Sequence, residues 1–387
     1  MIERQAEPAL RHFAKQFRAV LINGPRQSGK TTLAKTVFHE KPYALLEEID
    51  TRRFATEDPR AFLAQYPDGA ILDEVHKAPE LLSYLQGILD TSGARGQYVL
   101  TGSCNFQLLE SISQSLAGRV GQFELLPLSQ SELGQGAEPP ESLEETLFRG
   151  GYPEVHGESL DGERWYNAYI ETYLERDVRQ LINLRDVMTF QRFLGLCAGN
   201  CSQLLNTSRI GSDCGVHHNT VSNWLSILQA TYVVFLLPPH SANFRKRLVK
   251  TPKLYFFDTG LACRLLGIER PQQLVSHPLR GALFENWVVS ELMKARFNQG
   301  KKSNLFFWRN NTGLEVDVIA DHGETLLPVE VKSGATIASD WFTNLHKWTE
   351  LAGSTAEPGF LVYGGNLPQK RSTVTVLPWR EIGTLAV

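Results

Sequence analysis

A glycine-rich run near the start of the chain has the composition of a phosphate-binding loop. Residues 24–31 read GPRQSGKT and match G-x-x-x-x-G-K-[ST] at every position. The glycines would let backbone N–H groups turn inward, Lys30 would neutralise the β- and γ-phosphates, and the Thr31 hydroxyl would hold Mg²⁺. We therefore predict nucleotide contacts from Gly24, Pro25, Arg26, Gln27, Ser28, Gly29, Lys30, Thr31 and Thr32.

Further polar residues could complete phosphoryl transfer at this loop. Asp73, at the end of the apolar run AILDE, would bind the magnesium ion, and Glu74 would orient and deprotonate the attacking water. Ser103 follows the next apolar run and could touch the γ-phosphate, with a strand-ending turn as the alternative. Arg119 would stabilise the γ-phosphate charge, in cis or from a neighbouring chain, unless it is only a solvated loop arginine.

A second group of polar residues lies near the C-terminus. Glu285 falls in a helical pattern, Asp317 in the strand pattern EVDVIA, and Glu330 and Lys332 in PVEVKSG. Residues two apart on a strand share a face, so Glu330 and Lys332 should point the same way, with Asp317 beside them. This arrangement resembles the PD-(D/E)xK restriction-endonuclease-like core. The resemblance implies that Glu285, Asp317 and Glu330 bind a second Mg²⁺ or Mn²⁺ and that Lys332 positions the attacking water.

The elements that position these residues divide the chain into three predicted units. Residues 1–140 alternate short apolar strands (18–23, 69–73 and 97–101) with helical stretches, which predicts an α/β unit with a mostly parallel sheet. Residues 141–270 are mainly helical, and residues 271–387 mix a helix over 282–296 with strands at 305–309, 316–320, 325–331 and 359–363. Polar, Gly- and Pro-rich stretches mark the boundaries.

The middle unit has a helix-turn-helix pattern that could contact DNA. A second helix from about Asn219 would carry a polar, donor-rich outer face, and two strands would follow as a winged-helix wing. Between those strands, Arg245 to Lys253 are rich in basic residues without an acid and could contact phosphates. A protein-docking or lid role is the alternative. Cys197, Cys201, Cys214 and His217 have zinc-like spacing, but core packing is the preferred interpretation.

Composition limits the classes of protein. The net charge is −3 and the pI is near 6.4, which argue against bulk coating of nucleic acid but not against a local basic face. The longest apolar stretch, residues 232–237, is far shorter than the ~20 residues that span a bilayer. The five cysteines do not form a disulfide framework. We expect a cytoplasmic protein that has no membrane partner.

Taken together, the motifs resemble a prokaryotic family of AAA-type P-loop ATPases joined to a C-terminal module. They are GPRQSGKTTLAK, ILDEVHKAP, VLTGSCNF, SLAGR, GGYPEV and TYLERDV, in this order. The resemblance implies an ATP-binding, Mg²⁺-dependent ATPase. From the residues we expect it to act on DNA or to be regulated by DNA, with a metal-dependent nuclease as its C-terminal domain. The alternative is an ATP-dependent protein-interaction switch with a non-catalytic docking module. A homo-oligomer is compatible with either function.

Overall fold

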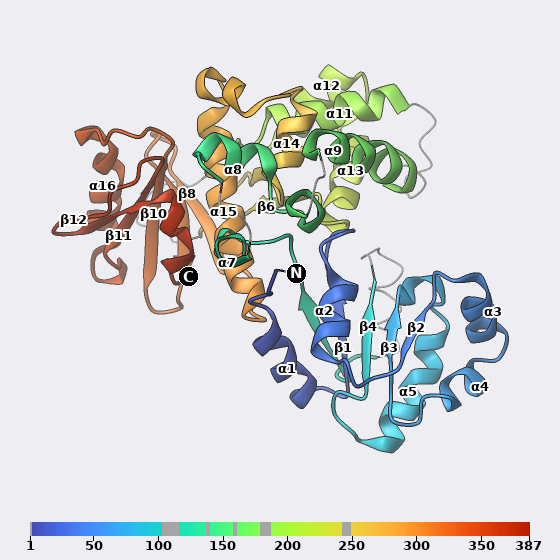
Figure 1. Ribbon diagram of the computed structural model, residues 1–387. Coiled ribbons are helices and arrows are strands. Elements are labelled where there is room, and N and C mark those ends of the chain that lie inside the picture. The colour runs from blue at the N-terminus through green and yellow to red at the C-terminus, as the bar shows by residue number, and fades with distance from the viewer. Residues whose placement is uncertain (1, 103–115, 137–139, 158–160, 179–186, 242–248) are drawn as a thin grey trace.

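The computed structural model describes residues 2–102, 116–136, 140–157, 161–178, 187–241 and 249–387. Ser103 and the segment Arg245–Arg247 lie outside the described residues. Figure 1 shows an N-terminal body built around one sheet and, beside it, a helical body that continues into a second sheet. The long helix α15 (Arg280–Asn298) stands between the helical body and the C-terminal sheet.

The N-terminal body is a parallel five-stranded sheet with the order β2-β3-β4-β1-β5. Its strands are β1 (Ala19–Asn23), β2 (Tyr43–Leu45), β3 (Ile71–Asp73), β4 (Tyr98–Thr101) and β5 (Val120–Glu124). Its helices are α1 (Glu7–Gln16), α2 (Lys30–Val37), α3 (Ile49–Glu57), α4 (Pro59–Ala64) and α5 (Leu81–Ser92), and a 3₁₀ turn spans Val75–Lys77. The predicted α/β class with a parallel sheet is confirmed.

Alternation along β1 shows why both faces of this sheet need helices. Ala19 and Leu21 pack with the cluster that includes Leu82 and Leu85 of α5, whereas Val20 and Ile22 pack with Leu10, Leu33 and Val37 of α1 and α2. Successive side chains of a strand point to opposite faces, so a strand that is apolar at every position must be covered on both sides.

The middle of the chain is mainly helical. Its α-helices are α7 (Gln130–Gly136), α8 (Leu143–Arg149), α9 (Gly162–Tyr169), α11 (Val187–Gly199), α12 (Thr207–Cys214), α13 (His218–Ala230) and α14 (Thr259–Leu265). It also has a 3₁₀ turn over Pro153–His156, a π-helical stretch over Ile170–Val178, and an antiparallel pair, β6 (Val234–Leu237) and β7 (Lys253–Phe256). The predicted helix pair and the strand pair are present, while their interpretation as a winged helix stays a prediction.

The C-terminal sheet has the order β12-β13-β11-β10-β9-β8. Its strands are β8 (Leu305–Arg309), β9 (Glu315–Asp321), β10 (Leu326–Lys332), β11 (Gly359–Tyr363), β12 (Gln369–Lys370) and β13 (Val374–Pro378). Helix α16 (Thr343–Ala352) and 3₁₀ turns at Pro271–Ser276, Ser339–Phe342, Gly353–Thr355 and Trp379–Thr384 complete the chain. The helix and the strands predicted from the sequence in this unit are all found, within two residues at each end.

One hydrophobic core joins the middle and C-terminal segments. It extends from Leu126 to Val387 and includes Trp224 of α13, Trp287 of α15 and Val329 of β10. Helix α15 is buried along most of its length because it packs on α14, β7 and β10. The N-terminal sheet, by contrast, has its own two clusters.

Among the described residues, no helix has the length and apolarity that crossing a bilayer requires. Cys197, Cys201, Cys214 and Cys263 are free and buried. Cys197, Cys201 and Cys214 belong to a hydrophobic core, which is the packing role preferred for them from the sequence.

Candidate functional site

The glycine-rich loop connects the end of β1 to the start of α2 through unusual backbone conformations. Gly24, Gln27 and Gly29 all have positive φ angles, of 149°, 62° and 90°. A side chain at Gly24 would collide with the backbone carbonyl of Leu125, so only glycine fits there. The loop therefore delivers successive backbone amides to the N-terminus of α2, the arrangement that binds phosphate groups.

Lys30 opens α2 and turns back over the loop. Its buried Nζ donates to the carbonyl oxygens of Pro25 at 2.7 Å and Gly24 at 3.2 Å. Ser28 is fully buried, and its Oγ finds no hydrogen-bond partner among the described residues. An orphaned polar atom inside a loop of this shape fits a phosphate oxygen as a partner. Gln27 and Thr32 are exposed, at the loop and on the first turn of α2.

Asp73 accepts hydrogen bonds from three hydroxyl groups at the carboxyl end of the sheet. Thr31 Oγ1 donates to both carboxylate oxygens of Asp73, at 2.9 and 3.0 Å, and Tyr43 OH donates at 2.6 Å. The third donor is Thr101 Oγ1 at the end of β4. Thr31 and Asp73 thus lie side by side as predicted, and a hydroxyl beside a carboxylate is an oxygen donor set that suits Mg²⁺.

Sequence reasoning missed Tyr43 and Thr101 as partners of Asp73. Burial, followed by the hydrogen bond to Asp73, raises the pKa of Tyr43 above its usual value, so the phenol remains a donor. Thr101 ends an apolar strand beside β3, and this position at the end of the strand could have identified it as a partner of Asp73. Tyr43 could not be identified from the sequence, because β2 has only three residues and is too short to show a strand pattern.

Glu74 follows Asp73 directly and has a left-handed backbone with φ of 57°. This conformation is uncommon outside glycine and is often found at functional sites. The Glu74 amide donates to Thr101 Oγ1 at 3.3 Å, and its carboxylate lies 3.0 Å from the Nδ1 atom of His76. The side chain is 24% exposed. The predicted base is therefore next to Asp73 and partly accessible to solvent.

Arg119 lies at the wrong end of the sheet to serve the loop of its own chain. It immediately precedes β5, and β5 pairs in parallel with β1 so that Val120 faces Ala19. The length of β1, about 16 Å at roughly 3.3 Å per residue, separates that edge from Gly24. There Arg119 makes a two-pronged ion pair with Asp90, at 2.6 and 2.8 Å. The predicted action in cis is wrong, and action from a neighbouring chain stays a prediction.

The C-terminal polar residues come together as the strand pattern predicts. Lys332 Nζ lies 2.8 Å from Glu330 Oε1 on β10. Asp317 on the neighbouring β9 accepts from the Val331 amide at 2.8 Å. Glu285 extends into the same region from α15. Its proximity is seen in the electrostatics, since, in addition to burial, the charge of Asp317 raises the pKa of both Glu285 and Glu330.

The sequence did not reveal the cation at the centre of this cluster. Lys253, on β7, places its Nζ 2.8 Å from Glu285 and 2.5 Å from Glu315, and its side chain is only 4% exposed. Tyr255 also donates to Glu285, at 2.6 Å. The predicted phosphate contact by Lys253 is therefore wrong, since its ammonium is enclosed by carboxylates. Lys250 is exposed.

Burial dominates the electrostatics of the cluster. Burial raises the pKa of Glu285 and Glu330, the charge of Asp317 raises both further, and Lys253 and Lys332 oppose the effect. The pKa of Asp317 is raised by burial as well. Burial lowers the pKa of Lys253, but the Glu285, Asp317 and Glu315 charges outweigh it and raise the pKa above its usual value.

The predicted three-carboxylate metal site is not formed. Within the described ranges no three such acids are grouped to hold an ion, although Glu285, Asp317 and Glu330 are neighbours. The physical reason is that Oε1 of Glu285 is already bound to Lys253 and Tyr255, and Asp317 accepts a backbone amide. Glu330 keeps one buried oxygen without a partner among the described residues.

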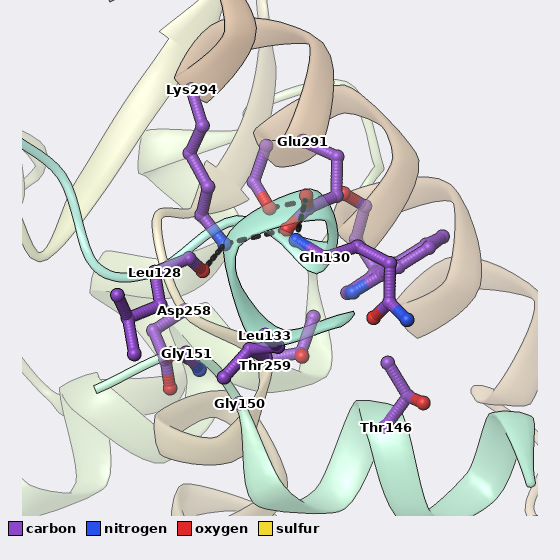
Figure 2. A pocket seen from close by; sticks show the side chains of 12 residues that line it. Leu128, Gln130, Leu133, Thr146, Gly150, Gly151, Asp258, Thr259, Glu291 and Lys294 are labelled. Carbon is purple, nitrogen blue, oxygen red and sulfur yellow. Dashed lines mark hydrogen bonds and ion pairs between the residues drawn. The ribbon is translucent and has the colours of Figure 1, made fainter. Parts of the chain in front are cut away.

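A buried polar junction connects α15 to the segment that follows β5 and to the turn at Gly150 and Gly151 (Figure 2). Lys294 of α15 pairs with Glu291 at 2.6 Å and donates to the Leu128 carbonyl at 3.0 Å, and the Gln130 amide donates to Glu291 at 2.7 Å. Gly151 lines the same small cavity. The cavity has room for about one water molecule.

The segment from Gly150 to Pro153 joins this junction to the phosphate loop. The Gly151 amide donates to Asp258 at 2.7 Å, and a side chain at Gly151 would strike the Leu128 carbonyl. Two residues further, the ring of Pro153 lies 3.8 Å from the position of a Cβ at Gly29. The guanidinium of Arg26 also lies 5.8 Å from the ring of Tyr173 in the π-helical stretch. The helical body therefore contacts the outer side of the loop.

Helix α13 presents the polar face expected of it. Val221, Trp224, Leu225 and Leu228 are buried, whereas His218, Asn219, Ser222 and Asn223 are exposed. The helix begins at a cap in which the His217 ring accepts from the Asn219 amide at 3.3 Å. Its N-terminal turn and the exposed face are thus available to a partner.

Comparison with known proteins assigns the N-terminal part. A family described as AAA domain matches residues 16–134, and two domains of unknown function, DUF8612 and DUF4143, match residues 140–272 and 280–382. Among solved structures, a Walker-type ATPase of Pyrococcus abyssi has a TM-score of 0.47 and 16% identity, covering 68% of this chain and 96% of that one. AMPPCP-bound DnaA of Aquifex aeolicus has a TM-score of 0.31 and 15% identity, covering 58% and 85%.

Two curated relatives are similar over most of the chain. They are the uncharacterized proteins Rv2008c of Mycobacterium tuberculosis and Mb2031c of Mycobacterium bovis, each 31% identical over 342 residues, which is 87% of this chain and 75% of theirs. The chain therefore belongs to the same family as these two mycobacterial proteins, and its N-terminal part is an AAA-type P-loop ATPase domain.

Proposed function

We propose that this protein hydrolyses ATP with Mg²⁺ and that the nucleotide controls contact of the helical body with DNA. The observation that carries hydrolysis is the direct pairing of Thr31 with Asp73, next to the partly exposed carboxylate of Glu74. A nucleotide-binding loop alone would not need an acid with access to solvent. A base beside the metal position has a use only if water attacks the nucleotide.

Each residue has a distinct part in this proposal. The loop amides and Lys30 would hold the phosphates, and Thr31 and Asp73 would hold Mg²⁺, which supplies charge neutralisation at the β- and γ-oxygens. Tyr43 and Thr101 orient the Asp73 carboxylate. Glu74 would accept the proton of the attacking water, and its left-handed backbone lets its amide donate to Thr101 Oγ1.

The DNA proposal is supported by the exposed face of α13. Helices of this type place their N-terminal residues against base edges, and amide side chains such as Asn219 and Asn223 can donate to and accept from bases. The contacts of Pro153 and Tyr173 with the loop give the nucleotide a route to the helical body. A conformational change in the phosphate loop would thereby be transmitted to the helical body, which contains α13.

Hydrolysis is tested by phosphate release with Mg²⁺ and ATP, with Glu74→Gln as the decisive variant. We expect Glu74→Gln to bind ATP but to lose turnover by about 10²-fold, because general-base catalysis typically contributes 10²–10⁴-fold. The matched control is Glu80→Gln, which changes an exposed acid beyond the same 3₁₀ turn. Full turnover in Glu74→Gln would contradict the assigned base.

DNA contact is tested by the anisotropy of labelled double-stranded DNA at low salt, with ATP, with ADP and without nucleotide. The double variant Asn219→Ala/Asn223→Ala should weaken binding, whereas Ser226→Ala, one turn further along α13, should not. If the unmodified protein binds no DNA in any nucleotide state, the DNA proposal fails while ATP hydrolysis stands.

A second candidate is an ATP-dependent switch that docks a protein partner through a non-catalytic C-terminal unit. The observation in its favour is Lys253, whose ammonium already neutralises the carboxylates that a nuclease would offer to a metal. Incubation of DNA with Mn²⁺ and the full chain separates a non-catalytic C-terminal unit from a nuclease. Cleavage that disappears in Asp317→Ala would favour a nuclease, and absence of cleavage would favour the docking module.

A further inference from the structure

Arg4, ahead of α1, lies against the back of the phosphate loop. Its Nη1 donates to the Ser28 carbonyl at 2.8 Å, its Nη2 to the Leu126 carbonyl at 2.7 Å, and its Nε to Glu132 at 2.9 Å. The side chain is only 9% exposed. Arg4 thus joins three segments that are far apart in sequence, and one of them is the loop itself.

The partner of Arg4 is itself held rigidly. The Glu132 carboxylate is fully buried and also accepts from the Gln5 amide at 2.9 Å, the Ser129 amide at 2.7 Å and Ser129 Oγ at 3.1 Å. A buried charge is tolerated only when it is paired and hydrogen-bonded in this way. The position of the guanidinium is therefore fixed by the fold rather than by chance contact at a surface.

The contact with Ser28 determines the direction of the next amide. In a trans peptide the carbonyl and the N–H point in opposite directions, so the Gly29 N–H points away from the guanidinium. A positive charge on the carbonyl also polarises the peptide and makes its N–H a stronger donor. Nη1 of Arg4 lies only 3.5 Å from the Cβ position at Gly29, directly behind this peptide.

We propose that Arg4 is a positioning residue of the nucleotide site, which fixes the Ser28–Gly29 peptide so that its N–H donates to a phosphate oxygen. The inference rests on the proposed function, because it needs a nucleotide in the loop. It assigns to the N-terminal segment a part in phosphate binding that lies outside the glycine-rich motif.

Arg18 provides a matched control in the same domain. Like Arg4, it donates to a backbone carbonyl, that of Leu89, and to a carboxylate, that of Asp90. However, it precedes β1 and lies at the opposite edge of the sheet from the loop. Arg18 and Asp90 are more exposed than Arg4 and Glu132, so loss of Arg18 should cost less stability. The readout that distinguishes the two positions is nucleotide affinity, which should change at Arg4 alone if Arg4 is a positioning residue.

The experiment measures MgADP affinity by calorimetry and the kcat and KM of ATP hydrolysis for the full chain. Arg4→Gln should weaken MgADP roughly tenfold, the effect of one charge-assisted hydrogen bond. KM should rise by a similar factor, with kcat within about threefold, since the bond acts on ground state and transition state alike. Arg18→Gln should leave the affinity unchanged.

Two further variants separate positioning from folding. Arg4→Gln/Glu132→Gln removes both charges, so no unpaired buried charge remains, and it should regain the unfolding temperature while the affinity stays weak. Arg4→Lys can pair with Glu132, but a point charge cannot replace the planar fork, so it too should regain stability and not affinity.

The outcomes distinguish this inference from the proposed function. If the unmodified protein neither binds MgADP nor hydrolyses ATP, both fail. If it binds MgADP and Arg4→Gln binds equally well, only the positioning role is overturned. Recovery of both stability and affinity in Arg4→Lys would also overturn it, because that would make Arg4 a structural charge.

Discussion

The two acidic clusters of this protein differ in what surrounds their carboxylates. At the phosphate loop, Asp73 is surrounded by the hydroxyl groups of Thr31, Tyr43 and Thr101. In the C-terminal cluster, Glu285 and Glu315 share the ammonium of Lys253, and Glu330 pairs with Lys332. Hydroxyl groups orient a carboxylate without cancelling its charge, whereas lysines cancel it.

This difference separates a site that needs an external cation from one that carries its own. The Asp73 charge remains to be neutralised, which suits a magnesium ion delivered with a nucleotide. In the C-terminal cluster the neutralising charge is part of the chain and links β7 to α15 and β9. Although both sites contain acidic residues, we therefore expect the Asp73 site to depend on a metal ion and the C-terminal cluster not to depend on one.

Removal of the internal cation should have the largest effect. Lys253→Ala leaves Glu285 with only the Tyr255 hydroxyl and Glu315 with only Arg309, and loss of the buried ammonium that neutralises both carboxylates should cost about 3 kcal/mol. The urea midpoint should fall, whereas Lys250→Ala, at an exposed lysine of the same segment, should keep it. If Mn²⁺ restores the midpoint of Lys253→Ala, the cluster can accept an external cation and the contrast with Asp73 weakens.

Lys30→Ala should have the next largest effect. Loss of the buried ammonium of the loop should lower kcat/KM for ATP by about 10²–10³-fold, the cost of removing a group aimed at developing charge. Phosphate release measures it. Lys15→Ala, an exposed lysine on α1, should hydrolyse ATP at the normal rate. A normal rate in Lys30→Ala would place the reaction elsewhere.

The raised pKa of Glu330 should appear in the pH dependence of stability. Because the folded protein keeps this proton above the usual pKa of 4.5, the free energy of unfolding should fall as the pH rises from about 4.5 towards neutral. In EDTA, the decrease in the free energy of unfolding over this pH range should be smaller in Glu330→Gln than in the unmodified protein, by roughly 1–2 kcal/mol. The exposed Glu324→Gln should keep the slope of the unmodified protein, and an equal slope in Glu330→Gln would contradict the predicted direction.

Tyr43→Phe should have the smallest effect. It removes one of the three hydroxyl groups on Asp73 and keeps the ring on which Lys35 lies. The Mg²⁺ concentration for half-maximal ATPase activity should rise about two- to fivefold, as expected for one hydrogen bond. Tyr98→Phe removes a hydroxyl bound to the Tyr66 carbonyl in the same sheet and should leave the Mg²⁺ requirement unchanged.

Much of the fold and the phosphate loop could be predicted from the sequence, because strand alternation and the glycine-rich motif are contained in short segments. The same holds for Asp317, Glu330 and Lys332, whose spacing follows from one strand pair. Lys253 could not be found in this way, because it comes from β7 and meets the acids only after the chain has folded. Arg119 looked suitable by type, but the parallel register placed it at the far edge.

The single core from Leu126 to Val387 has a mechanical consequence. This core joins helices α8 to α14 to one face of the second sheet, while α16 covers the other face with a separate cluster. Because the shared core is continuous, we expect these elements to move as one lever. The N-terminal sheet keeps its own interior and meets that lever near the loop, where Pro153 lies close to Gly29, and at the end of β5, where Tyr232 donates to Glu124 at 2.9 Å. A small displacement at Gly29 would therefore be amplified with distance and be greatest at the far strands β12 and β13.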